Sequence, residues 1–167
     1  MFRSIEDFES IWKSESENMI NVMKSLTQES LSQSVADDHR NIGRIAWHIV
    51  LTIPEMISRT GLEFRGIKED DPVPDSLVKI IDAYKDASEQ LISEIKSKWS
   101  DDDLLKEDDM YGLKWKKGFA LYILVVHQAH HRGQMTVLMR QAGLKVPGVC
   151  GPSKEEWANF GAEAPEI

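Results

Sequence analysis

The sequence predicts an all-α protein, a four-helix, up-and-down bundle with long connecting loops and an irregular C-terminal tail. Apolar residues recur at three- and four-residue steps in four stretches of about 20 residues each, which is the spacing of an amphipathic helix. No pair of alternating, β-branched runs around a hairpin turn competes with these stretches. The chain has 167 residues, enough for one core of ordinary size, so we assign residues 1–167 to a single domain.

The first two predicted helices lie in the N-terminal part of the chain. The first runs from about Ser4 to Leu26, and the second from Asn41 to Gly61, a residue suited to the left-handed conformation that ends many helices. We expect Pro54 to kink the second helix, because proline removes one backbone donor. The apolar positions of the first helix are Ile5, Phe8, Ile11, Trp12, Met19, Val22, Met23 and Leu26, and those of the second are Ile42, Ile45, Ala46, Ile49, Ile53, Met56 and Ile57.

The other two helices occupy the C-terminal half. The third begins at Asp75 or Ser76, after a Pro-Val-Pro segment, and ends near Trp99. The fourth runs from Lys117 to Gly143, and Gly133 inside it indicates close approach of another helix. We expect loops over residues 61–74 and 100–116. The tail after residue 143 is irregular, with a short helix over residues 153–160 as its one regular piece.

Charge and composition exclude several classes of partner. The chain has 20 basic and 28 acidic residues, a formal charge of −8, which argues against binding to nucleic acid. It contains no apolar run long enough to span a membrane, and its start lacks the apolar run of a secretory signal. Its single cysteine, Cys150, excludes an internal disulfide and fits a reducing compartment. We therefore expect a cytoplasmic protein with no membrane partner.

Three histidines form the candidate site. His127 and His131 are four residues apart on the fourth helix, so their Cβ atoms are about 6 Å apart on one face, where the bundle would otherwise bury leucines. His48 lies in the middle of the second helix. A neutral imidazole is a common metal ligand, and three protein ligands leave one position of a divalent ion open. Core histidines with satisfied hydrogen bonds are the alternative, and spacing alone leaves both interpretations open.

Other polar residues near these positions have weaker signals. Gln134 lies seven residues after His127 and is a candidate for a polar residue that supports the ligands. Glu55 lies seven residues after His48 and is a candidate for a base or for a residue that orients bound water. We interpret Arg132 as a solvated or ion-paired helix residue rather than as an anion-binding one. We place His130 on the flank of the bundle and His39 in a solvated loop.

A known family matches these motifs. Residues 127–134, His-Gln-Ala-His-His-Arg-Gly-Gln, resemble the HxxxHRGQ signature of the DinB-like family of four-helix-bundle metalloproteins. Residues 45–48, Ile-Ala-Trp-His, are similar to that family's second-helix histidine, and residues 144–152 to its C-terminal segment. The resemblance covers nearly the whole chain. It implies one divalent ion held by His48, His127 and His131, and a possible homodimer.

The resemblance also implies reaction classes. Members of the family have been interpreted as metal-dependent hydrolases, and related bundles use low-molecular-weight thiols such as bacillithiol, mycothiol or glutathione. We expect a zinc or nickel enzyme that activates water or a cellular thiol against a small electrophilic substrate, a hydrolase or a thiol S-transferase. The alternative is a non-catalytic, metal-stabilised bundle that binds a partner. No phosphate-binding loop, Gly-x-Ser-x-Gly elbow or His-Glu-x-x-His motif is present, and the sequence assigns no catalytic residue beyond the ligands.

Overall fold

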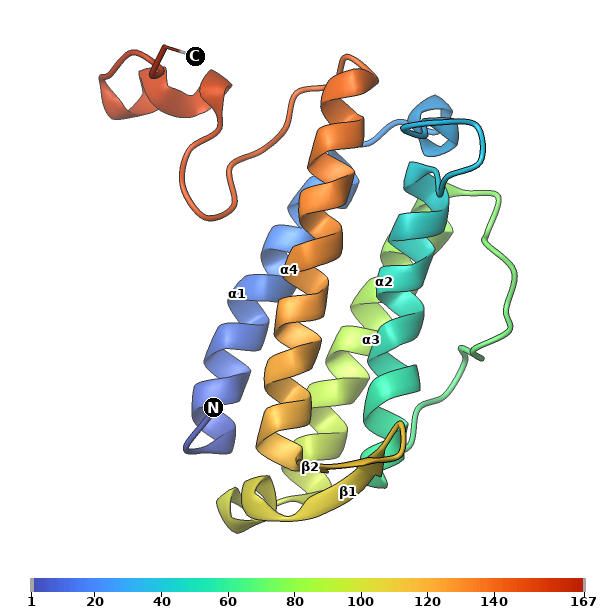
Figure 1. Ribbon diagram of the computed structural model, residues 1–167. Coiled ribbons are helices and arrows are strands. Elements are labelled where there is room, and N and C mark those ends of the chain that lie inside the picture. Colours follow the sequence, from blue (N-terminus) through green and yellow to red (C-terminus); the bar gives the residue numbers. More distant parts are fainter. Residues whose placement is uncertain (1, 167) are drawn as a thin grey trace.

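Four long helices pack side by side in the computed structural model of the protein, which describes residues 2–166 (Figure 1). They are α1 (Ile5–Lys24), α2 (Ile42–Ile57), α3 (Leu77–Lys98) and α4 (Lys117–Gln141). The predicted four-helix bundle is confirmed, and the predicted helix ends lie within a few residues of the observed ones. Across residues 2–166, no helix combines the length and the apolar composition needed to cross a bilayer.

Local side-chain chemistry explains where the helices begin and end. Ser4 caps α1, because its hydroxyl accepts from the Asp7 backbone N–H at 3.0 Å and Asp7 accepts in return from the Ser4 N–H. Asn41 caps α2 by accepting from the Arg44 N–H at 2.8 Å. The chain leaves α2 through a 3-10 turn, η2 (Ser58–Thr60), and turns away at Gly61, where φ is +85°. The α-helix continues for three residues beyond Pro54.

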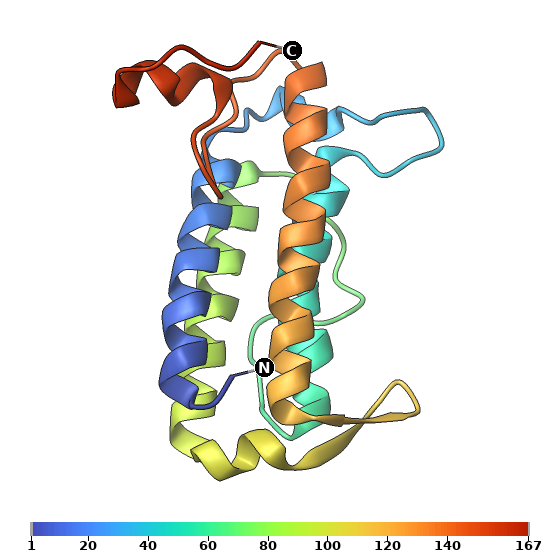
Figure 2. The same cartoon turned by 60° about the vertical axis from the view of Figure 1, so that its left-hand side comes forward.

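The helix directions differ from the predicted up-and-down alternation. The N-terminus of α3 lies at the end of α1, where the Leu77 N–H donates to Gln28 Oε1 at 3.0 Å. The N-terminus of α4 lies at the end of α2, where Lys117 Nζ donates to the Thr60 carbonyl at 2.5 Å. Helices α2 and α3 are therefore parallel, and the connection between them runs the length of the bundle (Figures 1 and 2). An extended chain of about 15 residues reaches roughly 50 Å, which is enough for this crossover.

The segment before α4 is a second correction, because we predicted a loop over residues 100–116. The structure has a 3-10 turn, η3 (Asp101–Leu105), followed by an antiparallel hairpin of β1 (Glu107–Met110) and β2 (Leu113–Lys116). Tyr111 and Gly112 form its turn, with φ values of +58° and +80°. Positive φ at both central residues is typical of a type I′ turn, which normally begins with Asn or Asp. Sequence analysis did not predict the hairpin, because a tyrosine is unusual at this turn position and acidic residues are uncommon in strands.

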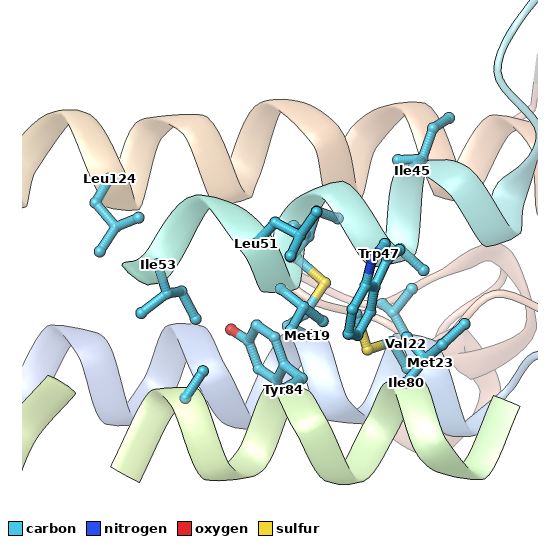
Figure 3. Packing of buried hydrophobic residues seen from close by; sticks show 14 of the residues in the cluster. Met19, Val22, Met23, Ile45, Trp47, Leu51, Ile53, Ile80, Tyr84 and Leu124 are labelled. Atoms are coloured by element: carbon cyan, nitrogen blue, oxygen red, sulfur yellow. The ribbon is translucent and has the colours of Figure 1, made fainter. Parts of the chain in front are cut away.

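The core fills the space between all four helices (Figure 3). Most predicted apolar positions are buried, with Ile11 as an exception at 48% exposure. Trp12 links α1 to α3, because its indole N–H donates to the Ser88 hydroxyl on α3 at 2.8 Å. Labelled core residues in Figure 3 are Met19, Val22 and Met23 of α1, Ile45, Trp47, Leu51 and Ile53 of α2, Ile80 and Tyr84 of α3, and Leu124 of α4.

The first part of the C-terminal tail packs on the core through Val146, and its last part stands away from the bundle beside the end of α4 (Figures 1 and 2). Its one regular piece is the 3-10 helix η4 (Lys154–Phe160), which buries no residue. Glu156 holds the tail's own loop by accepting from the Gly148 N–H at 2.9 Å. Arg140 of α4 forms an ion pair with Glu155 and so ties the tail to the bundle. The predicted short helix is confirmed in its position but is a 3-10 helix.

Candidate metal centre

Three histidines from two antiparallel helices meet in the bundle. His48 comes from α2, and His127 and His131 lie one turn apart on α4. One ring nitrogen of each lies within 4.8 Å of one ring nitrogen of the others. The ring centroids of His48 are 5.1 Å from His127 and 4.6 Å from His131. The structure therefore brings the three predicted ligands together.

The spacing of these nitrogens suits a single divalent ion. The Nε2 atoms of His127 and His131 are 3.1 Å apart. Two nitrogens bound about 2.1 Å from one ion are separated by about 3.0 Å at a right angle and about 3.4 Å at the tetrahedral angle. The observed separation falls between these values, so both rings can bind one ion without moving their helices.

The hydrogen bonds of the three rings do not fit the alternative of satisfied core histidines. Within residues 2–166, neither nitrogen of His48 forms a hydrogen bond to the protein, and the Nδ1 atom of His127 is buried without a partner. Buried polar groups normally have partners, since an unpaired one costs about 1–3 kcal/mol. Only His131 is fully paired, because its Nδ1 bonds to Gln134 Oε1 at 2.7 Å. A cation bound between the rings would give His48 a partner, whereas a cation held by the Nε2 atom of His127 would leave the Nδ1 atom of that ring unpaired.

Gln134 holds His131 in the tautomer that leaves its Nε2 atom free to act as a ligand. An amide oxygen only accepts, so the Nδ1 atom of His131 carries the proton and its Nε2 lone pair faces the other two rings. The amide nitrogen of Gln134 donates to His130 Nε2 at 3.2 Å, which fixes the orientation of the amide. Gln134 thus lies where sequence analysis expected a supporting residue.

Electrostatics keep the three imidazoles neutral. Burial, followed by the charges of the other two histidines, lowers the pKa of His48 to about 4. Burial and the neighbouring His131 and His130 lower the pKa of His127 to about 4, against a small opposing effect of Glu55. The pKa of His131 is also lowered, mainly by burial. Neutral imidazole is the form that binds metals, so the site is ready for an ion at neutral pH.

These pKa values predict that the metal-free protein loses stability as the pH falls from 7.5 to 5. In the unfolded chain His48 and His127 take up protons near pH 6.5, whereas in the folded chain they stay neutral down to about pH 4. Their contribution to the free energy of unfolding is therefore complete above pH 6.5 and is lost as the pH falls toward 4. Urea unfolding at pH 7.5, 6 and 5 measures the slope. A variant with both histidines changed to glutamine should have a smaller slope, and an equal slope would contradict this assignment.

The structure places Glu55 in a polar cluster beside the site. Its carboxylate accepts from Arg59 Nη2 at 2.9 Å and from the Tyr111 hydroxyl at 2.7 Å. Burial, followed by the bond to Glu55, raises the pKa of Tyr111 to about 12, so the phenol remains a donor. Glu55 acts on His127 through its charge, and no hydrogen bond within residues 2–166 joins the two. Sequence analysis missed Tyr111 and Arg59, since their approach depends on the hairpin.

Several other residues lie away from the three histidines. Arg132 faces α1, where it is buried in an ion pair with Glu15. Cys150 is exposed in the tail, in a hollow with Val137 and Arg140. A Cβ on Gly133 would meet no atom within 4 Å, so the predicted close helix approach at this glycine is wrong.

A cavity of about 550 Å³ opens beside His131. The loop before α2, the first turns of α2 and the C-terminal half of α4 form its walls, and Gln134 lies in the same lining. This volume is in the range of small-molecule sites, about 300–1,000 Å³. A space that admits a small molecule therefore reaches one of the three histidines, His131.

Comparison with known proteins identifies the family of the chain. The sequence profile of the DinB family matches residues 1–166. The chain belongs to the DinB family. It is 45% identical over 167 residues to the uncharacterized protein YrdA of Bacillus subtilis (strain 168), with the whole of both chains covered. This match extends family membership to the hairpin and the tail as well as the helices.

Two solved structures share the fold. A crystal structure of a DinB-like protein from Bacillus cereus ATCC 10987 is 46% identical, with a TM-score of 0.86, and the match covers 89% of this chain and 99% of that one. A DinB-like protein from Bacillus subtilis, YjoA, has a TM-score of 0.67 at 15% identity, covering 86% of this chain and 97% of the other. The second likeness concerns the fold alone.

Proposed function

We propose that this DinB family protein is a metal-dependent enzyme in which His48, His127 and His131 hold one zinc or nickel ion. The observation that supports this most directly is the convergence of three neutral rings, with one ring nitrogen of each within 4.8 Å of one ring nitrogen of the others. Imidazole nitrogen suits both metals, so the ligand set favours neither. Three protein ligands leave one side of the ion for a substrate.

The chemistry that such an ion supplies is activation of a water or of a small thiol through a lowered pKa. The residues of the chain have separate tasks. Gln134 holds His131 in the orientation and tautomer of a ligand. The cavity beside His131 admits a small electrophile and excludes a macromolecule. Glu55 supplies a carboxylate charge that acts on His127, and the Arg59 and Tyr111 bonds hold that carboxylate in place.

A turnover screen tests the proposal and separates its two forms. Zinc- and nickel-loaded protein is incubated with activated esters, amides and electrophiles, with and without cellular thiols. Turnover with water alone identifies a hydrolase, and thiol-dependent turnover identifies an S-transferase. In both cases His131→Ala should abolish turnover while the far-ultraviolet circular dichroism spectrum stays helical. Turnover that survives this substitution would contradict the proposal.

The second candidate is a non-catalytic bundle that the ion stabilises and that binds a partner. The exposed tail helix η4, which buries no residue, favours this alternative. It predicts that the metal raises the melting temperature and that no electrophile in the screen is consumed. The cavity beside His131 favours the enzyme, since a purely structural ion has a closed coordination sphere.

Gln134→Ala should lower the affinity for zinc about 10- to 100-fold, because the substitution frees the orientation and tautomer of His131. Gln134→Glu should restore most of the affinity, as a carboxylate also accepts from the Nδ1 proton. Competition with a chromophoric chelator measures the dissociation constants. Gln141→Ala, an exposed glutamine at the end of the same helix, is the matched control. Equal zinc affinities of Gln134→Ala and the wild type would remove this role.

A further inference from the structure

The cavity beside His131 has walls of two different kinds. Val35, Ile45, Val137 and Leu138 line its apolar part. His131 and Gln134 lie at one polar edge, and Arg40, from the loop before α2, lies at another. One continuous space therefore joins His131 to a cationic side chain, with apolar surface between them. A ligand that fills this space has an apolar body and polar ends.

The charges around this cavity are unusual for so acidic a chain. The formal charge of the protein is −8, and yet Arg40 and Arg44 are both exposed and form no ion pair within residues 2–166. Arg40 lies in the lining of the same cavity as His131. The carboxylate in the lining, Asp38, is bound to His39 Nδ1 at 2.6 Å. The guanidinium of Arg40 is thus the cation that remains for a ligand.

The type of cation indicates the type of anion. A guanidinium has a planar fork of N–H donors that matches the two oxygens of a carboxylate. The cavity lining contains a single arginine and no lysine. A phosphate site typically gathers several cations or backbone donors. The lining therefore fits a singly charged carboxylate better than a phosphate.

We propose that this cavity binds a small carboxylate-bearing molecule, with its carboxylate on Arg40, its apolar body against Val137 and Leu138, and its other end at His131. This assignment rests on the proposed function for the reaction at His131. The carboxylate subsite itself consists of side chains that are in place without an ion. A substrate or a thiol cosubstrate that carries a carboxylate belongs to this class.

The test compares two probes of the same shape, 4-phenylbutyrate and its neutral amide, 4-phenylbutyramide. Their dissociation constants are measured by ligand-observed NMR on the full chain, once metal-free and once zinc-loaded. We expect the metal-free protein to bind the acid about tenfold more tightly than the amide, which is the effect of one charge-assisted hydrogen-bonded pair. Added salt should reduce the difference, because the pair is partly exposed.

Two arginine variants locate the effect. Arg40→Gln should remove the preference for the acid, whereas Arg65→Gln, an exposed arginine that lines a different hollow beside α3, should keep it. Circular dichroism melts show that each variant is folded. Equal binding of acid and amide, binding of neither probe, or a preference that survives Arg40→Gln would overturn the carboxylate site.

The metal-free arm separates this inference from the proposed function. If the protein binds no metal but prefers the acid through Arg40, the carboxylate site stands and the proposed metal chemistry fails. If it binds metal and turns over substrates but treats acid and amide alike, the carboxylate site fails and the metal chemistry stands. A preference for the acid that appears only after zinc loading assigns the carboxylate to the ion and also overturns the role of Arg40.

Discussion

His131→Ala should lower the affinity for zinc or nickel by more than about 100-fold. Loss of a residue that only supports a ligand costs about 10- to 100-fold, and His131 is proposed as a ligand itself. Its ring also lies nearest to both other rings, with centroids 4.6 Å from His48 and 4.4 Å from His127. The two histidines that remain cannot enclose an ion from three sides. Chelator competition at pH 7.5 gives the affinity of each variant.

His130→Ala is the comparison variant for this experiment. His130 is the neighbouring residue on the same helix, but it is exposed, and its ring accepts from the Gln134 amide. We expect this variant to retain one ion per chain with an affinity lowered by less than about tenfold, because it loosens only the amide of Gln134. His48→Ala and His127→Ala should resemble His131→Ala. An affinity of His131→Ala within about threefold of the wild type would show that the ion, if bound, lies elsewhere.

Glu15→Ala should destabilise the protein by about 3–5 kcal/mol. Glu15 on α1 and Arg132 on α4 form an ion pair in which the side chains are only 11% and 6% exposed. Removal of the carboxylate leaves a buried guanidinium without its counter-charge, and broken buried pairs cost this much. Urea unfolding at pH 7.5 measures the free energy of unfolding.

An exposed pair between α1 and α3 supplies the comparison. Lys96 bonds to Glu9 at 3.1 Å, with side chains 56% and 37% exposed, so Glu9→Ala should cost at most about 1 kcal/mol. Changing Glu15 and Arg132 together to methionine should recover most of the lost stability, because no unpaired charge remains. A cost of Glu15→Ala equal to that of Glu9→Ala would show that the Arg132 guanidinium reaches water.

The helices and the histidine ligands could be predicted from the sequence because both depend on local spacing. A period of 3.6 residues places Phe8, Trp12 and Met19 on one buried face regardless of the partner helix. The same period puts His127 and His131 on one face. That His48 would meet them followed from the family resemblance, since spacing within one helix says nothing about its neighbour.

Features that depend on contacts between distant segments could not be predicted. The connection after Gly61 was recognised as long, but a length permits either direction of the next helix. The Tyr111–Gly112 turn lacks the usual Asn or Asp, so the hairpin was missed, and the Tyr111 bond to Glu55 was missed with it. Arg132 was expected at the surface, because only the fold places Glu15 opposite it. The homodimer stays a prediction.

X-ray absorption spectroscopy of the zinc- or nickel-loaded protein tests the central claim most directly, because it counts the ligands of the ion. We expect one ion per chain, with three imidazole nitrogens at about 2.0–2.1 Å and one further light ligand. With a small thiol added, one ligand should become sulfur at about 2.3 Å if the thiol reaction is correct. A folded protein that takes up neither metal, or an ion with fewer than three imidazole ligands, would contradict the metal centre of His48, His127 and His131.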